Sequence, residues 1–519
     1  MGEHVHRIGK WGQHPAALSI LAGATYALAF PPFQVSPLAW VALVPLVLAV
    51  RRVRTWRRAA LCGAGAAVVM CAIGYAWIAD MSIRFWHAPL PVAALLLLLY
   101  ASFGEINFTL FALLLYRWRT RLERWPAVTT AALFTLLEVL VPKIFPDTLG
   151  STQVAVPFLP SASALVGTFG LSFVIAWFAS CLAWMVWSAP AIRRRRGVEL
   201  VMCLACSAGL WLYGVRRQHA MDALPVQREL RLALVQSNIG DAGVFVQELG
   251  SSALMASTVI GRYVGMTRAT LQQGPVDIVI WPETAIPVSP RDQAFEPVRA
   301  MVRDLDIALV FGGYDFQVQR TGRWRVYNTL FWMDRRGRIR ERYHKSKLLP
   351  LGEHIPFADR FPVLLDIIPN AGEFTPGSGP RAFEIDGVQV APLICYELLF
   401  PRYVRRGVRM GGEVLLNLTN DYWFGRYAEP QQHFALARMR TFETGRPIVR
   451  ATNTGISALI DANGRILAQT ALSQPEVLRA TLPLRAVPAT PYLRAGEWCV
   501  VALVGGAWGL VALAWRLFR

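Results

Sequence analysis

Long apolar stretches alternate with short polar loops over the first 215 residues of the chain and return near its end. Eight of these stretches are long enough, or nearly long enough, to cross a bilayer as helices. We place them at residues 15–33, 36–50, 59–79, 89–116, 126–145, 161–188, 198–214 and 497–516. The pattern predicts a multi-pass α-helical membrane domain over residues 1–217 and a C-terminal transmembrane helix over residues 491–519.

The region between these two parts has a different pattern, in which short apolar runs alternate with amphipathic stretches. Strand-like runs include "LRLALVQSN", "DIVIWPE", "VQVAPLICYE" and "EVLLNLTND", and several are apolar throughout, as expected for strands buried on both faces. Helical periodicity falls between such runs in residues 256–273, 295–305 and 429–445. This alternation predicts an α/β domain over residues 218–490, built as an α-β-β-α layered sandwich.

Arginines are concentrated in three of the loops between the apolar stretches. Their runs occupy residues 51–58, 117–124 and 193–196, after the second, fourth and sixth stretches. Loops with such runs remain on the cytoplasmic side of a membrane. We therefore expect both termini in the cytoplasm and the α/β domain on the outer side of the membrane.

The net charge of +19 raises the alternative of a nucleic-acid-binding protein. The basic residues cluster beside apolar stretches, however, and no aromatic-interleaved basic stripe or zinc-finger spacing accompanies them. Cys203 and Cys206 form a C-x-x-C within an apolar stretch, without a second pair of ligands. We therefore expect no nucleic-acid partner, and neither a zinc site nor a redox site at this pair.

Cys395 differs from the other cysteines in its surroundings. Six of the seven cysteines lie in or beside the apolar stretches, whereas Cys395 lies in the α/β region, within the strand-like "VAPLICYELLF". Most buried cysteines behave as small apolar side chains, so a core residue is one interpretation. A nucleophile at the end of a strand is the other, if a nearby base or cation populates the thiolate.

Two further strand ends carry residues that could complete such a site. Glu283 ends "DIVIWPE", where desolvation should raise its pKa toward that of a general base, although a capping carboxylate fits equally well. Lys345 and Lys347 in "RYHKSKLLPLGEHIPF" could supply a cation that stabilises an oxyanion, or could belong to a solvated loop. Spacing does not choose between the two lysines.

The notable polar residues within the apolar stretches are Glu105, Asn107 and Glu138. A carboxylate inside a membrane is costly, so such residues are candidates for a function. Partnered polar groups inside a helix bundle are the other interpretation, and the sequence favours neither.

The motifs "WPET", "KSKLLPLGEHIPF" and "LICYELLFP" resemble the three motif blocks of the nitrilase, or carbon–nitrogen hydrolase, superfamily, which carries a Glu-Lys-Cys triad. The apolar stretches on both sides, together with "NLTNDYWFG" and "TPYLRAGEW", resemble more closely the bacterial apolipoprotein N-acyltransferase family. The resemblance covers most of the chain and is strongest from about residue 277 to residue 497. It implies a nitrilase-like fold for the α/β domain.

The resemblance also implies a role for individual residues. Glu283 matches the general base, Lys345 the oxyanion-stabilising lysine and Cys395 the nucleophile. Lys347 falls outside the family pattern and is then a bystander. Supporting residues are implied at Glu353, Tyr396 and Glu397.

By resemblance, the activity is transfer of an acyl chain from a phospholipid to a diacylated apolipoprotein through a thioester on the cysteine. The implied location is the bacterial inner membrane, with the catalytic domain in the periplasm. We expect a monomer without a metal or organic cofactor. Two alternatives remain: a membrane-tethered amidase with the same triad, and a catalytically silent scaffold.

One stretch departs from the family pattern. After "VQSNIG" the family has Pro-Gln and then Lys-Trp, whereas this chain has "DAGVFVQELGSSALM". The tryptophan of the family's mobile loop, which is thought to engage lipid, has no obvious counterpart. "FADRFPVLLDIIP" and "NDYWFGRY" are candidates for a membrane-facing rim, or for ordinary core.

Overall fold

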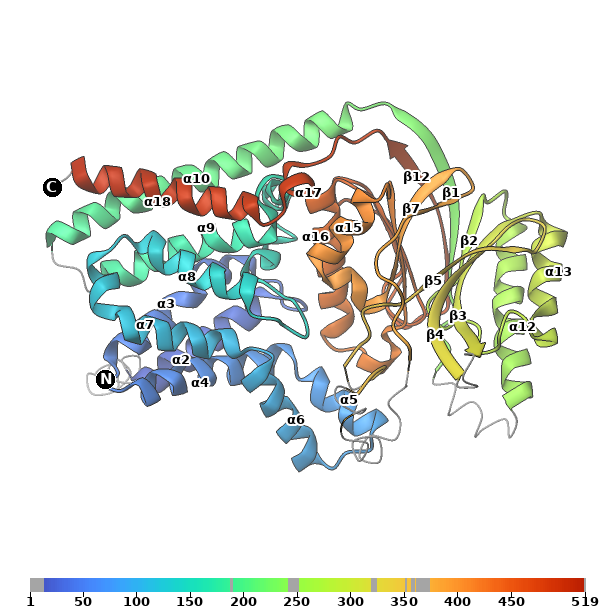
Figure 1. Cartoon of the computed structure of the whole chain (residues 1–519), viewed down its shortest axis with the longest axis horizontal. Helices are drawn as coiled ribbons and strands as arrows, with labels where there is room; N and C mark the ends of the chain where they lie inside the picture. Colours follow the sequence, from blue (N-terminus) through green and yellow to red (C-terminus); the bar gives the residue numbers. More distant parts are fainter. Residues whose placement is uncertain are drawn as a thin grey trace, which may run out of the picture. The chain divides into compact units, whose positions relative to one another are not determined.

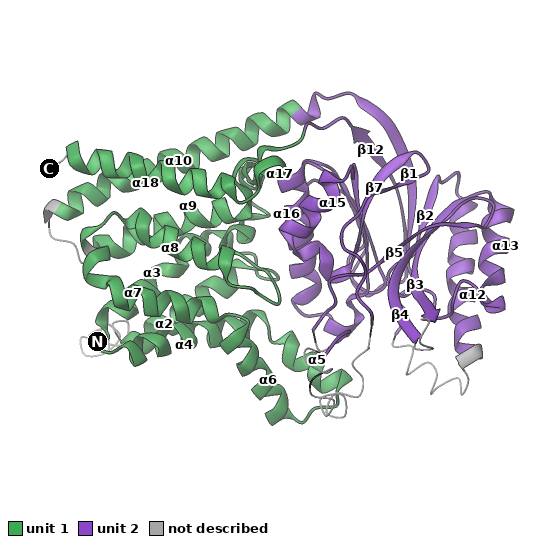
Figure 2. Ribbon diagram, viewed as in Figure 1, with its two compact units in different colours: residues 1–220, 489–519 green, residues 221–488 purple. Residues whose placement is uncertain are grey.

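The structure is a computed structural model that describes residues 14–186, 190–240, 252–318, 324–350, 352–355, 360 and 374–517. The chain divides into two compact units (Figure 2). Residues 1–220 and 489–519 form the first unit, and residues 221–488 form the second.

The first unit is built from helices in the part of the chain that the structure describes (Figure 1). Its first helices are α2 (Pro15–Ala29), α3 (Ala39–Arg52), α4 (Trp56–Gly74), α5 (Trp77–Phe85), α6 (Leu90–Phe103) and α7 (Ile106–Arg124). They are followed by α8 (Ala127–Leu140), α9 (Ser163–Met185) and α10 (Pro190–Asp222) and, after the second unit, by α17 (Pro491–Ala495) and α18 (Trp498–Leu517).

The helices of this unit differ in length more than the hydropathy pattern suggests. Among the described residues, four are long and apolar enough to cross a membrane, or five if the bent pair α6 and α7 counts as one span. The helices α2 and α8 are apolar but only 15 and 14 residues long. The helix α3 has 14 residues and contains Pro45. The predicted number of eight spans therefore exceeds the number of helices that reach across a bilayer by length and composition.

The predicted span 89–116 is two helices, which meet at a bend of 46°. The bend falls at Gly104 and Glu105, and Glu105 has a non-helical backbone (φ −114°, ψ 30°). Its buried carboxylate pairs with Lys143 (Oε2 to Nζ, 2.8 Å). Hydropathy alone does not reveal this break, because the apolar residues continue on both sides of it.

Glu105, Asn107 and Glu138 are all buried inside the first unit. Lys143, which pairs with Glu105, also contacts Asp147 (Nζ to Oδ1, 2.8 Å). Glu138 accepts a hydrogen bond from the backbone N–H of Leu149 (2.8 Å). Glu105 and Glu138 are thus partnered polar groups within the bundle.

The second unit contains two six-stranded sheets. The first has the order β12-β1-β2-β3-β4-β5 and the second the order β11-β10-β9-β8-β7-β6. The strands of the first sheet are β1 (Val226–Gln236), β2 (Ile278–Ile280), β3 (Ala308–Val318), β4 (Trp324–Met333), β5 (Ile339–His344) and β12 (Glu476–Arg485). Those of the second are β6 (Phe383–Ile385), β7 (Val388–Ile394), β8 (Val414–Thr419), β9 (Ile448–Thr452), β10 (Ala458–Ile460) and β11 (Ile466–Gln469).

The two sheets face each other, and helices cover their outer faces (Figure 1). Apolar side chains of both sheets, including Leu232 and Leu416, line one small gap between them. Helices α12 (Ser252–Leu271) and α13 (Glu296–Leu305) share a core with the first sheet. Helices α15 (Pro401–Arg409) and α16 (Glu429–Thr444) pack against the second. This arrangement confirms the predicted α-β-β-α sandwich.

The parallel strands in the centre of each sheet position two of the candidate site residues. Strands β1, β2 and β3 run parallel to one another in the first sheet, and β7, β8 and β9 do so in the second. Glu283 lies three residues beyond β2, and Cys395 directly follows β7. Both residues therefore lie at carboxyl ends of buried parallel strands, where α/β sheets commonly carry their sites.

Candidate active site

Glu283 lies in a turn that approaches the neighbouring strand β3 closely. A Cβ atom at Gly312 would lie 2.6 Å from the Cα of Glu283, so this approach requires glycine there. The carboxylate of Glu283 is buried and accepts hydrogen bonds on both oxygens. Oε1 accepts from Lys345 Nζ (3.0 Å) and Asn328 Nδ2 (2.7 Å), and Oε2 from the backbone N–H of Asn420 (2.8 Å).

Lys345 bridges two carboxylates inside the domain. Its Nζ lies 3.0 Å from Glu283 Oε1 and 2.8 Å from Glu353 Oε1, and its side chain is 2% exposed. Lys347, in contrast, is exposed, and its Nζ lies 5.6 Å from the centre of the Phe400 ring. The structure therefore distinguishes the two lysines and brings Lys345 alone into the buried cluster.

The pKa of Glu283 and the pKa of Lys345 are both raised above their ordinary values. Burial raises the pKa of Glu283 above its ordinary value, an effect that the ammonium of Lys345 opposes and the charge of Glu353 reinforces. Burial alone would lower the pKa of Lys345, but the two carboxylates outweigh it and raise that pKa. The site thus combines a lysine that stays charged with a carboxyl group suited to exchanging protons closer to neutral pH.

Cys395 occupies the sharp turn between β7 and the short 3-10 helix η5 (Cys395–Leu399). Its φ of +49° lies in the left-handed region, which costs a residue other than glycine about 1–2 kcal/mol. Burial raises the pKa of the thiol, the charge of Glu283 adds to this rise, and Lys345 opposes it. The thiol thus lies within electrostatic range of both a carboxylate base and a cation.

Glu397 connects the turn at Cys395 to the segment that carries the lysine. It is fully buried, and its Oε2 accepts hydrogen bonds from the backbone N–H of Ile394 (2.9 Å) and from the hydroxyl of Tyr343 (2.7 Å). Its Oε1 accepts from the backbone N–H groups of Ser346 (2.7 Å) and Lys347 (3.1 Å). One carboxylate therefore fixes the chain on both sides of the candidate site.

The remaining predicted residues support the same cluster. Glu353 accepts a hydrogen bond on Oε2 from the backbone N–H of Leu349 (2.9 Å), which closes the turn that follows Lys345. Tyr396 is buried, and its ring packs edge-on against Phe400 with the centroids 4.9 Å apart.

Two asparagines of the site escaped the sequence analysis. Asn328 on β4 donates to both carboxylates that flank the lysine, Glu283 (2.7 Å) and Glu353 (3.0 Å). Asn420 contributes its backbone N–H to Glu283 (2.8 Å). The sequence offered only a weak signal: one asparagine next to a threonine in the largely apolar run "YNTLFWM", and a backbone N–H that any residue except proline could supply.

A second charged cluster adjoins the thiol. The sulfur of Cys395, a carboxylate oxygen of Asp421 and a ring nitrogen of His433 lie within 4.8 Å of one another, an arrangement that could suit a metal ion. However, Arg450 Nη2 lies 2.9 Å from Asp421 Oδ2, and this buried cation opposes a dication at the same carboxylate. We therefore do not assign these three residues as metal ligands.

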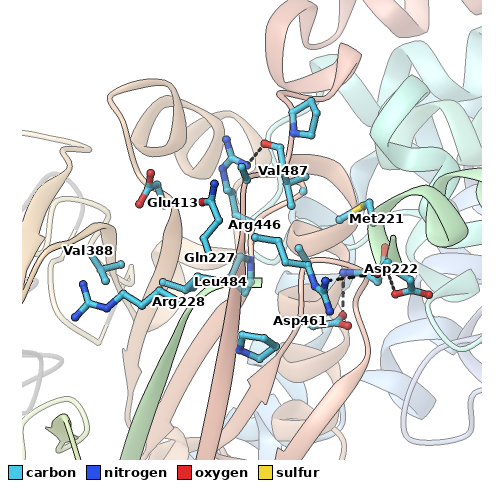
Figure 3. A pocket seen from close by; sticks show the side chains of 18 of the residues that line it. Met221, Asp222, Gln227, Arg228, Val388, Glu413, Arg446, Asp461, Leu484 and Val487 are labelled. Carbon is cyan, nitrogen blue, oxygen red and sulfur yellow. Dashed lines mark hydrogen bonds between the residues drawn. The ribbon is translucent and has the colours of Figure 1, made fainter. Parts of the chain in front are cut away.

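A cavity of about 730 Å³ lies elsewhere in the second unit (Figure 3). Two arginines that line it already have partners: Arg446 Nη1 donates to the carbonyl of Val487 (2.6 Å), and Arg465 Nη2 donates to Asp222 Oδ2 (2.5 Å). None of Glu283, Lys345 and Cys395 lines it. The cavity is therefore not part of the candidate active site.

Two expectations concern stretches that the structure describes only in part. Of "DAGVFVQELGSSALM", residues 241–251 lie outside the described residues, as do most residues of "FADRFPVLLDIIP". In "NDYWFGRY", Asp421 and Phe424 are buried, whereas Trp423 and Tyr427 are each 44% exposed. That stretch thus supplies both core residues and exposed aromatic rings.

Comparison with known proteins agrees with this architecture. The model of the apolipoprotein N-acyltransferase N-terminal domain matches residues 22–181, and that of carbon-nitrogen hydrolase matches residues 231–492. The apolipoprotein N-acyltransferase of Geobacter metallireducens is 29% identical over 512 residues, covering 96% of this chain and 95% of that protein. That of Allorhizobium ampelinum is 32% identical over 522 residues, covering 95% of both.

Among solved structures, Saccharomyces cerevisiae Nit3, a member of branch 10 of the nitrilase superfamily, matches with a TM-score of 0.38 and 17% identity. The match covers 50% of this chain and 92% of Nit3. The two family models and the near full-length relatives confirm the resemblance seen in the motifs. The chain belongs to the apolipoprotein N-acyltransferase family.

Proposed function

We propose that the chain transfers an acyl chain from a phospholipid to the N-terminal amine of the S-diacylglyceryl-cysteine of apolipoproteins. The observation that carries the proposal is the buried Glu283–Lys345 pair within electrostatic range of Cys395 at a strained strand end. It occurs in a chain that aligns with apolipoprotein N-acyltransferases over more than nine-tenths of its length. Glu283 is the general base, Lys345 the oxyanion-stabilising cation and Cys395 the nucleophile.

In the first step, Glu283 takes the proton of the Cys395 thiol, and the thiolate attacks the ester carbonyl of the phospholipid, at its sn-1 chain. The ammonium of Lys345 stabilises the oxyanion that develops in the tetrahedral intermediate. When the intermediate collapses, the carbon–oxygen bond breaks and Glu283 returns its proton to the leaving alkoxide. A lysophospholipid departs, and the acyl chain remains on Cys395 as a thioester.

In the second step, the amine of the diacylglyceryl-cysteine attacks the thioester, and Glu283 accepts a proton from the attacking nitrogen. The carbon–sulfur bond then breaks, and the sulfur of Cys395 regains a proton from Glu283. The product is a triacylated lipoprotein with a new amide bond. Neither step uses a metal or an organic cofactor.

The supporting residues hold this geometry. Glu397 fixes the segment after Lys345 against the turn at Cys395, and Glu353 and Asn328 orient the lysine and the base. Tyr396 packs beside the nucleophile against Phe400, and Glu397 helps to shape the pocket. Burial of the site also limits water at the thioester, whose hydrolysis would compete with transfer.

The proposal includes a place in the cell. The arginine runs at residues 51–58, 117–124 and 193–196 support a cytoplasmic amino terminus in the bacterial inner membrane. The catalytic domain, residues 218–490, then lies in the periplasm, between the membrane domain of residues 1–217 and the C-terminal transmembrane helix of residues 491–519. Both lipid substrates lie in the outer leaflet there, and one chain supplies every catalytic group, as in a monomer.

Mass spectrometry of the Cys395 peptide tests the proposal directly. The purified full-length chain is incubated with a phospholipid that carries an isotopically labelled sn-1 chain, and then with a synthetic diacylated lipopeptide. We expect a labelled, hydroxylamine-sensitive acyl group on Cys395 that moves to the lipopeptide amine. Absence of label on Cys395 would refute the transferase and leave the membrane-tethered amidase as the alternative. Full activity in a Cys395→Ala variant would show that Cys395 is not the nucleophile and would leave the scaffold as the alternative.

A further inference from the structure

Cys395 adjoins a group of buried charges that the mechanism above does not use. Its sulfur lies within 4.8 Å of a carboxylate oxygen of Asp421 and of a ring nitrogen of His433. Asp421 begins the short 3-10 helix η6 (Asp421–Phe424), two residues beyond β8, and His433 lies on α16. Three separate segments of the chain therefore bring an acid, an imidazole and a thiol together.

Asp421 is held in a single position by its neighbours. Its Oδ1 accepts hydrogen bonds from His433 Nδ1 (3.1 Å) and Thr419 Oγ1 (3.2 Å), and its Oδ2 accepts from Arg450 Nη2 (2.9 Å). The backbone of Gly455 comes so close that a Cβ atom there would lie 2.0 Å from Oδ2. Burial would raise the pKa of Asp421, but the cations of Arg450 and His433 outweigh it and lower that pKa. The residue is therefore an ionised carboxylate.

His433 faces two acids and one further cation. Its Nδ1 lies 3.1 Å from Asp421 Oδ1 and 3.4 Å from Oε1 of Glu429 on its own helix, and Arg450 on β9 pairs with the same Asp421. Burial and Arg450 lower the pKa of His433, but the two carboxylates outweigh them and raise it. Burial, together with Asp421, raises the pKa of Glu429 to about 7. Two carboxylates that face Nδ1 therefore favour the charged form of the imidazole beside the thiol.

We propose that His433 is a positioning residue for acyl transfer, whose imidazolium offsets the negative charge of Asp421 at the sulfur and so allows Cys395 to become a thiolate. A carboxylate within 4.8 Å of a buried sulfur opposes the negative charge that the nucleophile must acquire, whereas an imidazolium within the same range favours it. Glu283 and Lys345 exert the same pair of opposing effects on Cys395.

Thr419 links this cluster to the nucleophile. Its hydroxyl donates to Asp421 Oδ1 (3.2 Å), and a hydrogen bond from the same side chain to Cys395 lowers the pKa of the thiol, against the larger effect of burial. A hydroxyl has one proton to donate, so the carboxylate and the sulfur compete for it. The imidazolium satisfies the carboxylate and leaves the Thr419 proton to the thiolate. The inference rests on the proposed role of Cys395 as nucleophile.

The variant His433→Asn tests the charge, because its amide keeps a neutral N–H donor near the position of Nδ1. The readout is the pH dependence of iodoacetamide alkylation of the full-length chain, with the Cys395 peptide resolved from the other cysteines by mass spectrometry. Loss of an opposite charge at this distance is expected to raise the thiol pKa by about one unit. Alkylation at pH 7.5, and acylation by phospholipid, should then slow about tenfold.

The double variant Asp421→Asn with His433→Asn separates charge from structure. It removes the acid and the cation together, so we expect the alkylation profile to return to within about half a pH unit of the parent. If the cluster acted only as a structural support, the double variant would react as slowly as His433→Asn or more slowly, and this result would overturn the proposal.

The neighbouring substitution Phe434→Leu is the matched control, since it changes buried packing on α16 without changing charge. Its profile should match that of the parent, and an equal shift would assign the effect to packing. The parent chain gives a measurement that needs no folded variant: its profile should depart from a single ionisation curve as His433 loses its proton. A profile that fits one ionisation would contradict the proposal.

The alkylation experiment needs no lipid, so the two proposals can fail separately. An unchanged profile in His433→Asn would overturn the role of His433, even where acyl transfer proceeds. Absence of a thioester in the parent chain would overturn the proposed function, while a shifted alkylation profile would still assign His433 to the thiol.

Discussion

Both units of the molecule bury a lysine between two carboxylates. In the first unit, Lys143 Nζ lies 2.8 Å from Glu105 Oε2 and 2.8 Å from Asp147 Oδ1. In the second, Lys345 Nζ lies 3.0 Å from Glu283 Oε1 and 2.8 Å from Glu353 Oε1. Distances, burial and residue types are nearly the same, so the ion pairs by themselves do not distinguish a structural cluster from a catalytic one.

A cysteine accompanies each cluster, and here the two differ. Cys71 is within electrostatic range of Glu105, Asp147 and Lys143, but it lies inside the regular helix α4 and is fully buried. Cys395 lies at the end of a strand with a φ of +49°, and its side chain is 7% exposed. The strained turn places the thiol at the carboxyl end of β7, and the first cluster has no such turn at its cysteine.

Replacing the two cysteines gives the largest expected contrast. Cys395→Ala removes the proposed nucleophile, so acyl transfer should fall by more than about 10³-fold. Cys71→Ala should leave acyl transfer per folded molecule within about twofold, because its cluster has no reacting atom, and should lower stability by about 1 kcal/mol. A radiolabelled lipopeptide assay with purified protein measures the first effect, and thermal unfolding in detergent the second. A large loss of transfer in Cys71→Ala would remove the distinction drawn here.

Replacing the two lysines gives the next largest effect. Lys143→Met and Lys345→Met each leave two buried carboxylates without their cation, and each should cost about 3–5 kcal/mol of stability. In Lys345→Met alone, the acylation rate per folded molecule should also fall about 10²–10³-fold, because the oxyanion loses its stabilising charge. Single-turnover formation of the thioester, normalised to folded protein, separates the two effects. If thioester formation per folded molecule were equally fast in Lys143→Met and Lys345→Met, Lys345 would have a structural role only.

The sequence predicted the fold and the main candidates because each left a local trace. Strands apolar on both faces predicted the sandwich, and Glu283, Lys345 and Cys395 each belong to a motif at the end of such a strand. The structure brings Glu283, Lys345 and Glu353 into one buried cluster, and their catalytic roles stay predictions.

Other features left no such trace, since they depend on contacts between distant segments. Glu105, which lies at the break between α6 and α7, pairs with Lys143 in the segment that follows α8. The role of Asn328 depends on hydrogen bonds to Glu283 and Glu353 that only the folded sheet creates. A hydropathy profile detects neither of these contacts.

Glu397 offers a smaller test, because it acts through position and not through chemistry. Glu397→Gln keeps one acceptor but turns an N–H₂ group toward donors such as Tyr343 and the backbone N–H of Ile394. We expect the acylation rate to fall about 10-fold to 10²-fold and the thermal midpoint to drop, since the Lys345 segment is no longer fixed to the turn at Cys395. Thioester formation and thermal unfolding report the two effects. An unchanged rate with a lowered midpoint would limit Glu397 to a structural role.

Replacing Glu353 tests the role of Glu283 through the pH dependence of thioester formation. Burial is the main reason why the pKa of Glu283 is raised, and the charge of Glu353 adds to that rise. Glu353→Gln removes this charge, so the pKa of Glu283 should fall and the base should remain ionised to lower pH. We expect the acidic limb of the pH–rate profile for thioester formation to move down by about half a unit to one unit, with a rate about tenfold lower at neutral pH. A shift of the acidic limb to higher pH would contradict the assignment of Glu283 as the base.

Lys347 should show the smallest effect, and it tests whether position outweighs charge in this segment. It lies two residues from Lys345 and carries the same charge, but its side chain is exposed and its Nζ lies over the ring of Phe400, 5.6 Å from the ring centre. Lys347→Met removes that cation–π contact, worth about 0.5–1 kcal/mol at an exposed site, and leaves the ion pairs of Lys345 intact. Thioester formation should therefore stay within about twofold of the parent at every pH at which Lys345→Met is strongly impaired. If Lys347→Met slowed the reaction as much as Lys345→Met, the buried bridge between Glu283 and Glu353 would no longer distinguish the two lysines.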